Sequence, residues 1–258
     1  MLPSLRRVLV AAVPLLSSLP SSASATWSIM VLDPATGLIG VAGASCTFDV
    51  YGIAGFVPGK GAVISQSIGN PAARELALKL LAEGVALDSV LRVITAATFD
   101  PRVQEQQYAI GTLGGGRVQF TGGAMGSHYA GERSADGVLV QGNSLPGGAV
   151  LDRAMAAVQQ ARAAGRPMAE VLMAGLKAGA DAGGDARCGA QRATSAFLIV
   201  VKPENKAHLP FLNLAVFGAE PGGVNAVDVL QARLARWRAT GGRMRVTTEW
   251  VQPDSTRR

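Results

Sequence analysis

Hydrophobic and polar residues form short blocks along the chain, and turns rich in glycine and proline separate these blocks. Short alternating runs are typical of strands in a sheet, whereas apolar residues three and four positions apart are typical of helices. In the first half of the chain, the pattern predicts strands over residues 26–32, 38–44, 61–66, 107–113 and 117–121. The first two strands are joined by a Pro- and Gly-containing turn, which predicts an opening hairpin.

Two helices are expected between the third and fourth of these strands. Asn70 followed by Pro71 is a favourable helix start, because Asn caps the free N–H groups and Pro fits the first helical position. Gly84 marks the end of that helix, and Asp88 is the expected cap of a second, shorter one. Residues 46–60, just before the third strand, are expected to form a glycine-rich loop.

The second half of the chain repeats this grouping of strands and helices. The elements expected there are strands over 138–141, 197–201 and 211–217 and helices over 150–158, 168–176 and 227–237. The unbroken apolar run 197–201 indicates a central strand buried on both faces, and residues 122–137 are expected to be a polar loop. Grouped strands and helices predict a single α+β domain with helices on both faces of two stacked sheets.

Residues 1–25 have the three parts of a secretory signal peptide. Arg6 and Arg7 supply the positive start, residues 8–16 are mostly apolar, and small residues precede a cleavage site after Ala25. The apolar run is shorter than the roughly 18 residues that a membrane-spanning helix needs. We therefore expect no membrane span and export to the periplasm or the extracellular space.

Removal of the signal predicts a mature domain over 26–240 and a basic tail over 241–258. Without the two signal arginines, the chain has 22 basic and 18 acidic residues, a formal net charge of +4. Because the basic residues cluster only toward the C-terminus, they indicate a solvated tail, and we expect no nucleic-acid partner.

Cys46 and Cys188 are the two cysteines. In an oxidising compartment such a pair is most simply a disulfide, with a catalytic thiol as the alternative.

Cleavage after Ala25 would make Thr26 the first residue. The α-amino group of a terminal threonine has an unperturbed pKa near 8, so it can accept the proton of its own hydroxyl and activate that hydroxyl as a nucleophile. The alternative is that Thr26 merely begins an edge strand, for which threonine is well suited.

Further candidate residues lie in glycine-rich segments. Gly142 and Asn143 are expected in a turn, where their backbone N–H groups could bind an oxyanion; the alternative is a simple strand-end turn with Asn in a left-handed conformation. Asp185 and Arg187 could bind a substrate carboxylate or form a salt bridge with each other.

His128 and His208 are far apart in sequence without matching carboxylates, so we expect no metal site. No phosphate-binding glycine motif opens a helix, so we expect no nucleotide cofactor.

An ordered set of motifs lies in the segments 26–37, 39–45, 61–66 with Asn70-Pro71, 120–122, 141–145, 183–187 and 195–196. This set resembles the DUF1028 family of the N-terminal nucleophile (Ntn) hydrolase superfamily. The resemblance implies a four-layer αββα sandwich with a nucleophile at the start of the first strand, which is Thr26 here. It also supports the disulfide, because Cys46 and the Arg187-Cys188 pair are similar to an exported branch of the family. Proteasome-like members place an Asp and a Lys near the nucleophile, and the sequence does not align Asp49 or Lys60 with those positions.

The sequence therefore favours an exported hydrolase that cleaves an amide bond of a small molecule or peptide with Thr26. A non-catalytic exported binding or assembly module on the same scaffold is the alternative. A third hypothesis is autoproteolysis at an internal Gly-Thr or Gly-Ser bond. The sequence leaves the substrate and association into homo-oligomers open.

Overall fold

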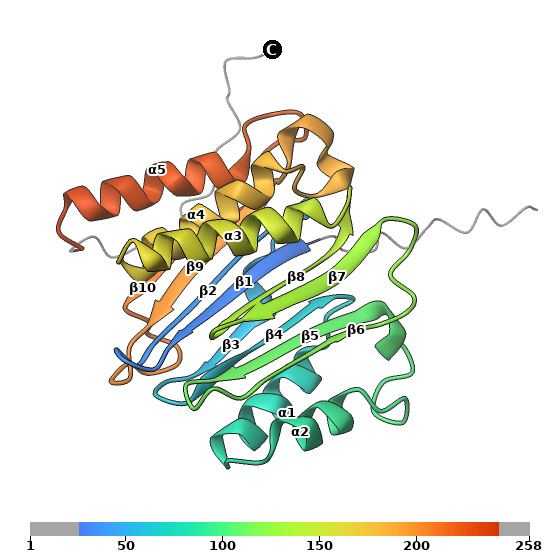
Figure 1. Ribbon diagram of the computed structural model, residues 1–258. Helices are drawn as coiled ribbons and strands as arrows, with labels where there is room; N and C mark the ends of the chain where they lie inside the picture. Colours follow the sequence, from blue (N-terminus) through green and yellow to red (C-terminus); the bar gives the residue numbers. More distant parts are fainter. Residues whose placement is uncertain (1–25, 243–258) are drawn as a thin grey trace, which may run out of the picture.

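The computed structural model describes residues 26–242, which contain ten strands and five α-helices (Figure 1). The larger sheet has the order β10-β9-β2-β1-β8-β7, with β1 Thr26–Asp33, β2 Leu38–Ser45, β7 Tyr129–Ala135, β8 Val138–Leu145, β9 Ser195–Val201 and β10 Leu212–Val216. The smaller sheet has the order β3-β4-β5-β6, with β3 Ala54–Val57, β4 Gly61–Ser67, β5 Gln106–Thr112 and β6 Arg117–Thr121. The helices are α1 Pro71–Ala82, α2 Leu87–Ile94, α3 Ala149–Ala163, α4 Met168–Asp181 and α5 Ala226–Ala239. Neighbouring strands in both sheets are antiparallel.

Alternation along each strand decides which part of the core a side chain joins. In β1, Trp27 and Ile29 pack in a cluster with residues of α3, α4 and α5, whereas Met30 and Leu32 point the other way, into a cluster between the sheets. A third cluster, which includes Tyr108, lies between the smaller sheet and helices α1 and α2. Figure 1 shows α3, α4 and α5 over the larger sheet and α1 and α2 on the outer side of the smaller one. The two sheets therefore face each other across a shared interior.

The structure confirms a single α+β domain and most of the expected elements. Asn70 caps α1 and Pro71 is its first residue, as the sequence predicts, because the Asn70 side chain accepts the N–H of Ala73 at 3.1 Å. The apolar run 197–201 lies within β9, in which every residue is buried. This strand pairs with β2 on one side and β10 on the other, which is the expected central position.

Three expectations about local structure are wrong. The expected loop 46–60 contains β3, and the expected loop 122–137 contains β7. Both are edge strands, so each depends on one neighbour for its hydrogen bonds and has a weak sequence pattern of its own. Asp88 does not cap α2, because this helix begins at Leu87 after Ala86 and Asp88 lies in its first turn.

The expected signal peptide over 1–25 and most of the expected tail, residues 243–258, lie outside the described residues. Helix α5 ends at Ala239, close to the expected domain boundary. Within residues 26–242, no helix is both long and apolar enough to cross a bilayer.

Candidate functional site

Thr26 is the first residue of β1 and lies in the middle of the larger sheet. It is opposite Ser45 of β2 on one side and Asn143 of β8 on the other. Because Trp27 packs toward the helices, Thr26 points in the opposite direction, into the interior between the sheets. The residue is 1% exposed. An interior position in the sheet rules out the edge-strand alternative for Thr26.

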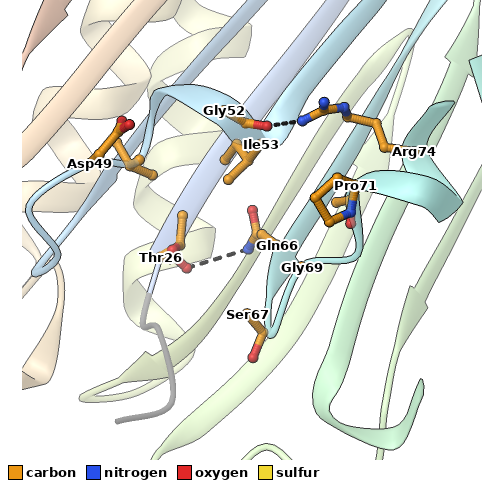
Figure 2. Close-up of a pocket in the computed structure, with 11 residues that line it drawn as sticks. Thr26, Asp49, Gly52, Ile53, Gln66, Ser67, Gly69, Pro71 and Arg74 are labelled. Atoms are coloured by element: carbon orange, nitrogen blue, oxygen red, sulfur yellow. Dashed lines mark hydrogen bonds between the residues drawn. The ribbon is translucent and has the colours of Figure 1, made fainter. Parts of the chain in front are cut away.

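A cavity of about 230 Å³ lies next to Thr26 (Figure 2). Three segments that are distant in sequence form its wall: the start of β1, the loop after β2, and the segment from the end of β4 into α1. The lining residues are Thr26, Asp49, Val50, Gly52, Ile53, Ser65, Gln66, Ser67, Gly69, Pro71 and Arg74. The wall combines a hydroxyl-bearing residue at the start of a strand with one acidic and one basic side chain.

The N-terminal end of α1 borders this cavity through Gly69 and Pro71. Helix N-termini carry partial positive charge and unpaired N–H groups, so this part of the wall favours developing negative charge. The Asp100 carboxylate accepts hydrogen bonds from the Asn70 amide at 2.7 Å and from the Gln106 amide at 2.6 Å, which anchors the capping residue. The backbone N–H of Arg102 and the Gln106 amide lower the pKa of Asp100, so the anchor is ionised at neutral pH.

A chain of buried amides crosses the interior beside Thr26. Gln66 Nε2 donates to Gln107 Oε1 at 2.9 Å and reaches the carbonyl oxygen of Thr26 at 3.5 Å. The same Gln107 oxygen accepts Asn143 Nδ2 at 2.9 Å, and Ser28 Oγ donates to Gln66 Oε1 at 2.5 Å. These bonds join both sheets and fix the amides around the first residue of β1.

Several buried polar atoms near this chain have no partner among the described residues. They are Asn143 Oδ1, both amide atoms of Gln141, and Ser195 Oγ. Ser195 lies opposite Ser45, which in turn lies opposite Thr26, so Ser195, Ser45, Thr26 and Asn143 form one row across four adjacent strands. Orphaned buried polar groups are rare and call for an explanation such as a bound water, a ligand or a catalytic role. Here they lie in the same row as Thr26 or in the neighbouring strand β8.

Left-handed backbone conformations of residues other than glycine also cluster at this end of the sheets. Ser67 in the cavity wall has φ of 70°, Ser144 next to Asn143 has 50°, and Arg192 between Cys188 and Ser195 has 71°. Such conformations cost free energy and occur preferentially at functional sites. Between Gly142 and Leu145 of β8 the ladder to β7 also shifts register, and this irregularity includes Asn143 and Ser144.

Gly142 and Asn143 are not in a turn, contrary to expectation. Both lie inside β8, and Gly142 is opposite Trp27 on one side and Gly131 on the other. The positive φ falls on Ser144 rather than on Asn143. The residue of this segment that lies opposite Thr26 is Asn143, in the adjacent strand.

Asp185 and Arg187 form the salt bridge that the sequence left open. The fully buried Asp185 carboxylate accepts Arg187 Nη2 at 2.9 Å, and it also accepts the backbone N–H of Cys46 at 2.6 Å. Cys46 and Cys188 form the predicted disulfide, with 5.6 Å between their Cα atoms. Neither member of the salt bridge lines the cavity next to Thr26. The bridge and the disulfide together hold the loop after β2, which supplies part of the cavity wall.

Asp49 and Lys60 lie in different parts of the structure. Asp49 lines the cavity with Thr26, whereas Lys60 is at the opposite end of β4 and donates to the carbonyl oxygen of Ala82. Across residues 26–242, no group of three or more His, Cys, Asp or Glu side chains is placed to hold a metal ion.

Gln66 and Arg74 are site residues that the sequence analysis did not identify. The sequence does contain a signal for Gln66. It is a polar residue at the end of the apolar strand 61–66, and it lies on the same face as Ile64, which is buried between the sheets. Arg74 has no comparable signal, because an arginine in the first turns of a helix is ordinary on a protein surface.

This fold and site define a single α+β domain of two antiparallel sheets with a polar cavity at the start of β1. The chain belongs to the family described as "Family of unknown function (DUF1028)", whose model matches residues 26–221. It is similar to the crystal structure of protein SPO2555 from Silicibacter pomeroyi, also assigned to DUF1028. The TM-score is 0.69 at 25% sequence identity, and the match covers 83% of this chain and 86% of that one. A search of curated proteins found no significant match.

Proposed function

We propose that this protein is an exported Ntn hydrolase that cleaves an amide bond with Thr26, after removal of residues 1–25 makes Thr26 the N-terminal residue. The stacked sheets with helices outside them are, in this proposal, the four-layer αββα sandwich of that superfamily. The observation that carries the proposal is the position of Thr26. It begins a central strand, borders a cavity of about 230 Å³, and is opposite Asn143, whose buried Oδ1 has no partner among the described residues.

In the proposed reaction, Thr26 Oγ1 attacks the amide carbonyl carbon while the Thr26 α-amine takes the hydroxyl proton. Negative charge develops on the carbonyl oxygen, and the segment that leads into the N-terminal end of α1, at Gly69 and Pro71, lies in the cavity wall, where its partial positive charge can stabilise the oxyanion. The C–N bond then breaks, and the ammonium returns its proton to the leaving nitrogen. Water attacks the resulting Thr26 ester with the amine again as base, which releases a carboxylic acid and restores the threonine.

Asn143 has a defined role in this proposal. Its Nδ2 is fixed by Gln107, whereas its buried Oδ1 has no partner among the described residues. Residues opposite each other in an antiparallel ladder have Cα atoms about 4.5–5.5 Å apart, so this acceptor is within reach of a donor at Thr26. A free Thr26 amine would supply that donor and would be held next to its own hydroxyl.

The test needs no knowledge of the substrate. The N-terminal residue and intact mass of the exported protein should show a chain that begins at Thr26, and one piece rather than two. A β-lactone probe acylates an activated threonine hydroxyl, so it should add its mass to Thr26 of the cleaved protein.

Two variants make this test specific. Protein that retains Ala25 should not react, because its amine is an amide, and Thr26→Ala should not react either. Thr240→Ala, an exposed threonine at the end of α5, should react like the wild type. A different N-terminus, or equal labelling of Thr26→Ala, would favour the alternative of a non-catalytic binding module.

A further inference from the structure

A second groove of about 640 Å³ adjoins the cavity beside Thr26. The two share Gly52 and Arg74, so these residues form the partition between them. Phe56, Leu78 and Pro210 are among the apolar residues of the second groove. The second groove therefore begins where the cavity ends, at Gly52 and Arg74.

At this junction, the only acidic side chain paired with Arg74 among the described residues is the exposed Glu75. Its Nη1 donates to the carbonyl oxygen of Gly52 (Figure 2), and its Nη2 lies 2.9 Å from Glu75 Oε1. The Arg74 side chain is 19% exposed, but Glu75 is 66% exposed. An ion pair with so exposed a carboxylate contributes little free energy, so a ligand carboxylate can replace Glu75 at small cost.

The surroundings of Arg74 favour an anion over a cation. Arg74 follows the N-terminal turn of α1, whose partial positive charge borders the cavity, and Lys79 lines the adjoining groove. Asp49 is the acidic residue of the cavity wall, but it is exposed, and its Oδ1 already accepts the backbone N–H of Tyr51 at 2.6 Å. A guanidinium that is mostly removed from water binds carboxylates with two parallel hydrogen bonds.

We propose that the ligand of this site is an elongated amide with a carboxylate a few bonds from the amide carbonyl, and that Arg74 binds this carboxylate. The amide lies at Thr26, and any longer chain lies in the groove beside Leu78. The cleavage of such a ligand rests on the proposed function, whereas its binding does not.

The binding test uses dicarboxylic acid monoamides of four, five and six carbons: succinamate, glutaramate and adipamate. Each is compared with the uncharged amide of equal chain length by titration calorimetry. At least one acid should bind about tenfold or more tightly than its uncharged partner, and Arg74→Gln should abolish that difference. Arg74→Lys should restore part of it, because it keeps the charge but not the paired hydrogen bonds. Arg153→Gln, on the exposed face of α3, is the matched control and should keep the full difference.

The hydrolysis test uses the corresponding p-nitroanilides, for example glutaryl against valeryl p-nitroanilide. A preference in kcat/KM for the acid that disappears in Arg74→Gln supports the proposal. Arg74-dependent binding of the monoamides without hydrolysis would keep the carboxylate site and refute the proposed reaction. Hydrolysis with equal kcat/KM for both anilides would keep the reaction and overturn the carboxylate site. Absence of both hydrolysis and charge-dependent binding would overturn the carboxylate site as well.

Discussion

Gln107 is the residue whose replacement should most clearly test the buried amide chain. Its side chain is fully buried, its Oε1 accepts Gln66 Nε2 and Asn143 Nδ2, and its Nε2 donates to Thr121 Oγ1 and to the carbonyl oxygen of Gly142, each at 2.9–3.0 Å. Gln107→Leu keeps nearly the same volume but removes these four bonds and a longer one, from Gln107 Nε2 to the carbonyl oxygen of Gly131 at 3.4 Å. The substitution therefore changes hydrogen bonding without opening a large cavity.

The expected loss of stability follows from the groups that are left behind. Gln66 Nε2 and Asn143 Nδ2 would each lose a buried acceptor, and an unsatisfied buried polar group costs about 1–3 kcal/mol. The more apolar leucine offsets roughly 1 kcal/mol of this. We expect the free energy of unfolding to fall by about 3 kcal/mol, a large fraction of the 5–15 kcal/mol that is typical of a domain.

Equilibrium unfolding in urea, with the disulfide intact, measures this change. Gln119→Leu is the matched control. It lies on the neighbouring strand, is only partly buried, and makes one bond, from Nε2 to the carbonyl oxygen of Val140 at 3.3 Å, so it should cost about 1 kcal/mol or less. If the two variants unfold at the same urea concentration, the amide chain does not stabilise the interior as argued.

Three further predictions concern stability. Replacing Cys46 and Cys188 together by serine opens a loop with a sequence separation of 142 residues, so urea unfolding should show a loss of up to about 5 kcal/mol on the chain-entropy model; an unchanged midpoint would contradict it. Because hydrogen bonds lower the pKa of Asp100 in the fold, its stabilisation is present above the unfolded pKa, near 3.8, and is lost as pH falls through the folded value. Asp100→Asn should therefore unfold with a shallower pH dependence below about pH 4, and an identical slope would refute the role of the carboxylate. An added Cβ at Gly175 would lie 2.5 Å from Val158 in α3, so Gly175→Ala should destabilise by about 1–2 kcal/mol despite its better helix propensity. Thermal melts should show this loss for Gly175→Ala, whereas Gly147→Ala, where a Cβ meets no atom within 4 Å, should be neutral.

Edge strands show where sequence patterns stop being informative. β9 was predictable because seven consecutive buried residues leave an unbroken apolar run. β7 was not, because six of its seven residues are only partly buried and one is exposed, so its sequence resembles a polar loop. It is a strand because β8 lies beside it and supplies hydrogen-bond partners along its length. Gly142 and Asn143 lie instead in the fully buried β8, and their strand character follows from the pairing of β8 with both β1 and β7.

The sequence by itself determined the class of fold, most helices and strands, the pairing of Cys46 with Cys188, and the family. Local periodicity, capping and turn residues predict the helices and strands, because each acts over a few neighbouring positions. The presence of two cysteines in a chain expected to be exported predicts the disulfide, and the ordered set of motifs predicts the family. Only the tertiary structure decided which residues surround Thr26. Asn143 and Arg74 are far from Thr26 in the sequence. Sheet register, not local sequence, places Asn143 opposite Thr26, and the packing of α1 places Arg74 in the wall of the cavity beside it.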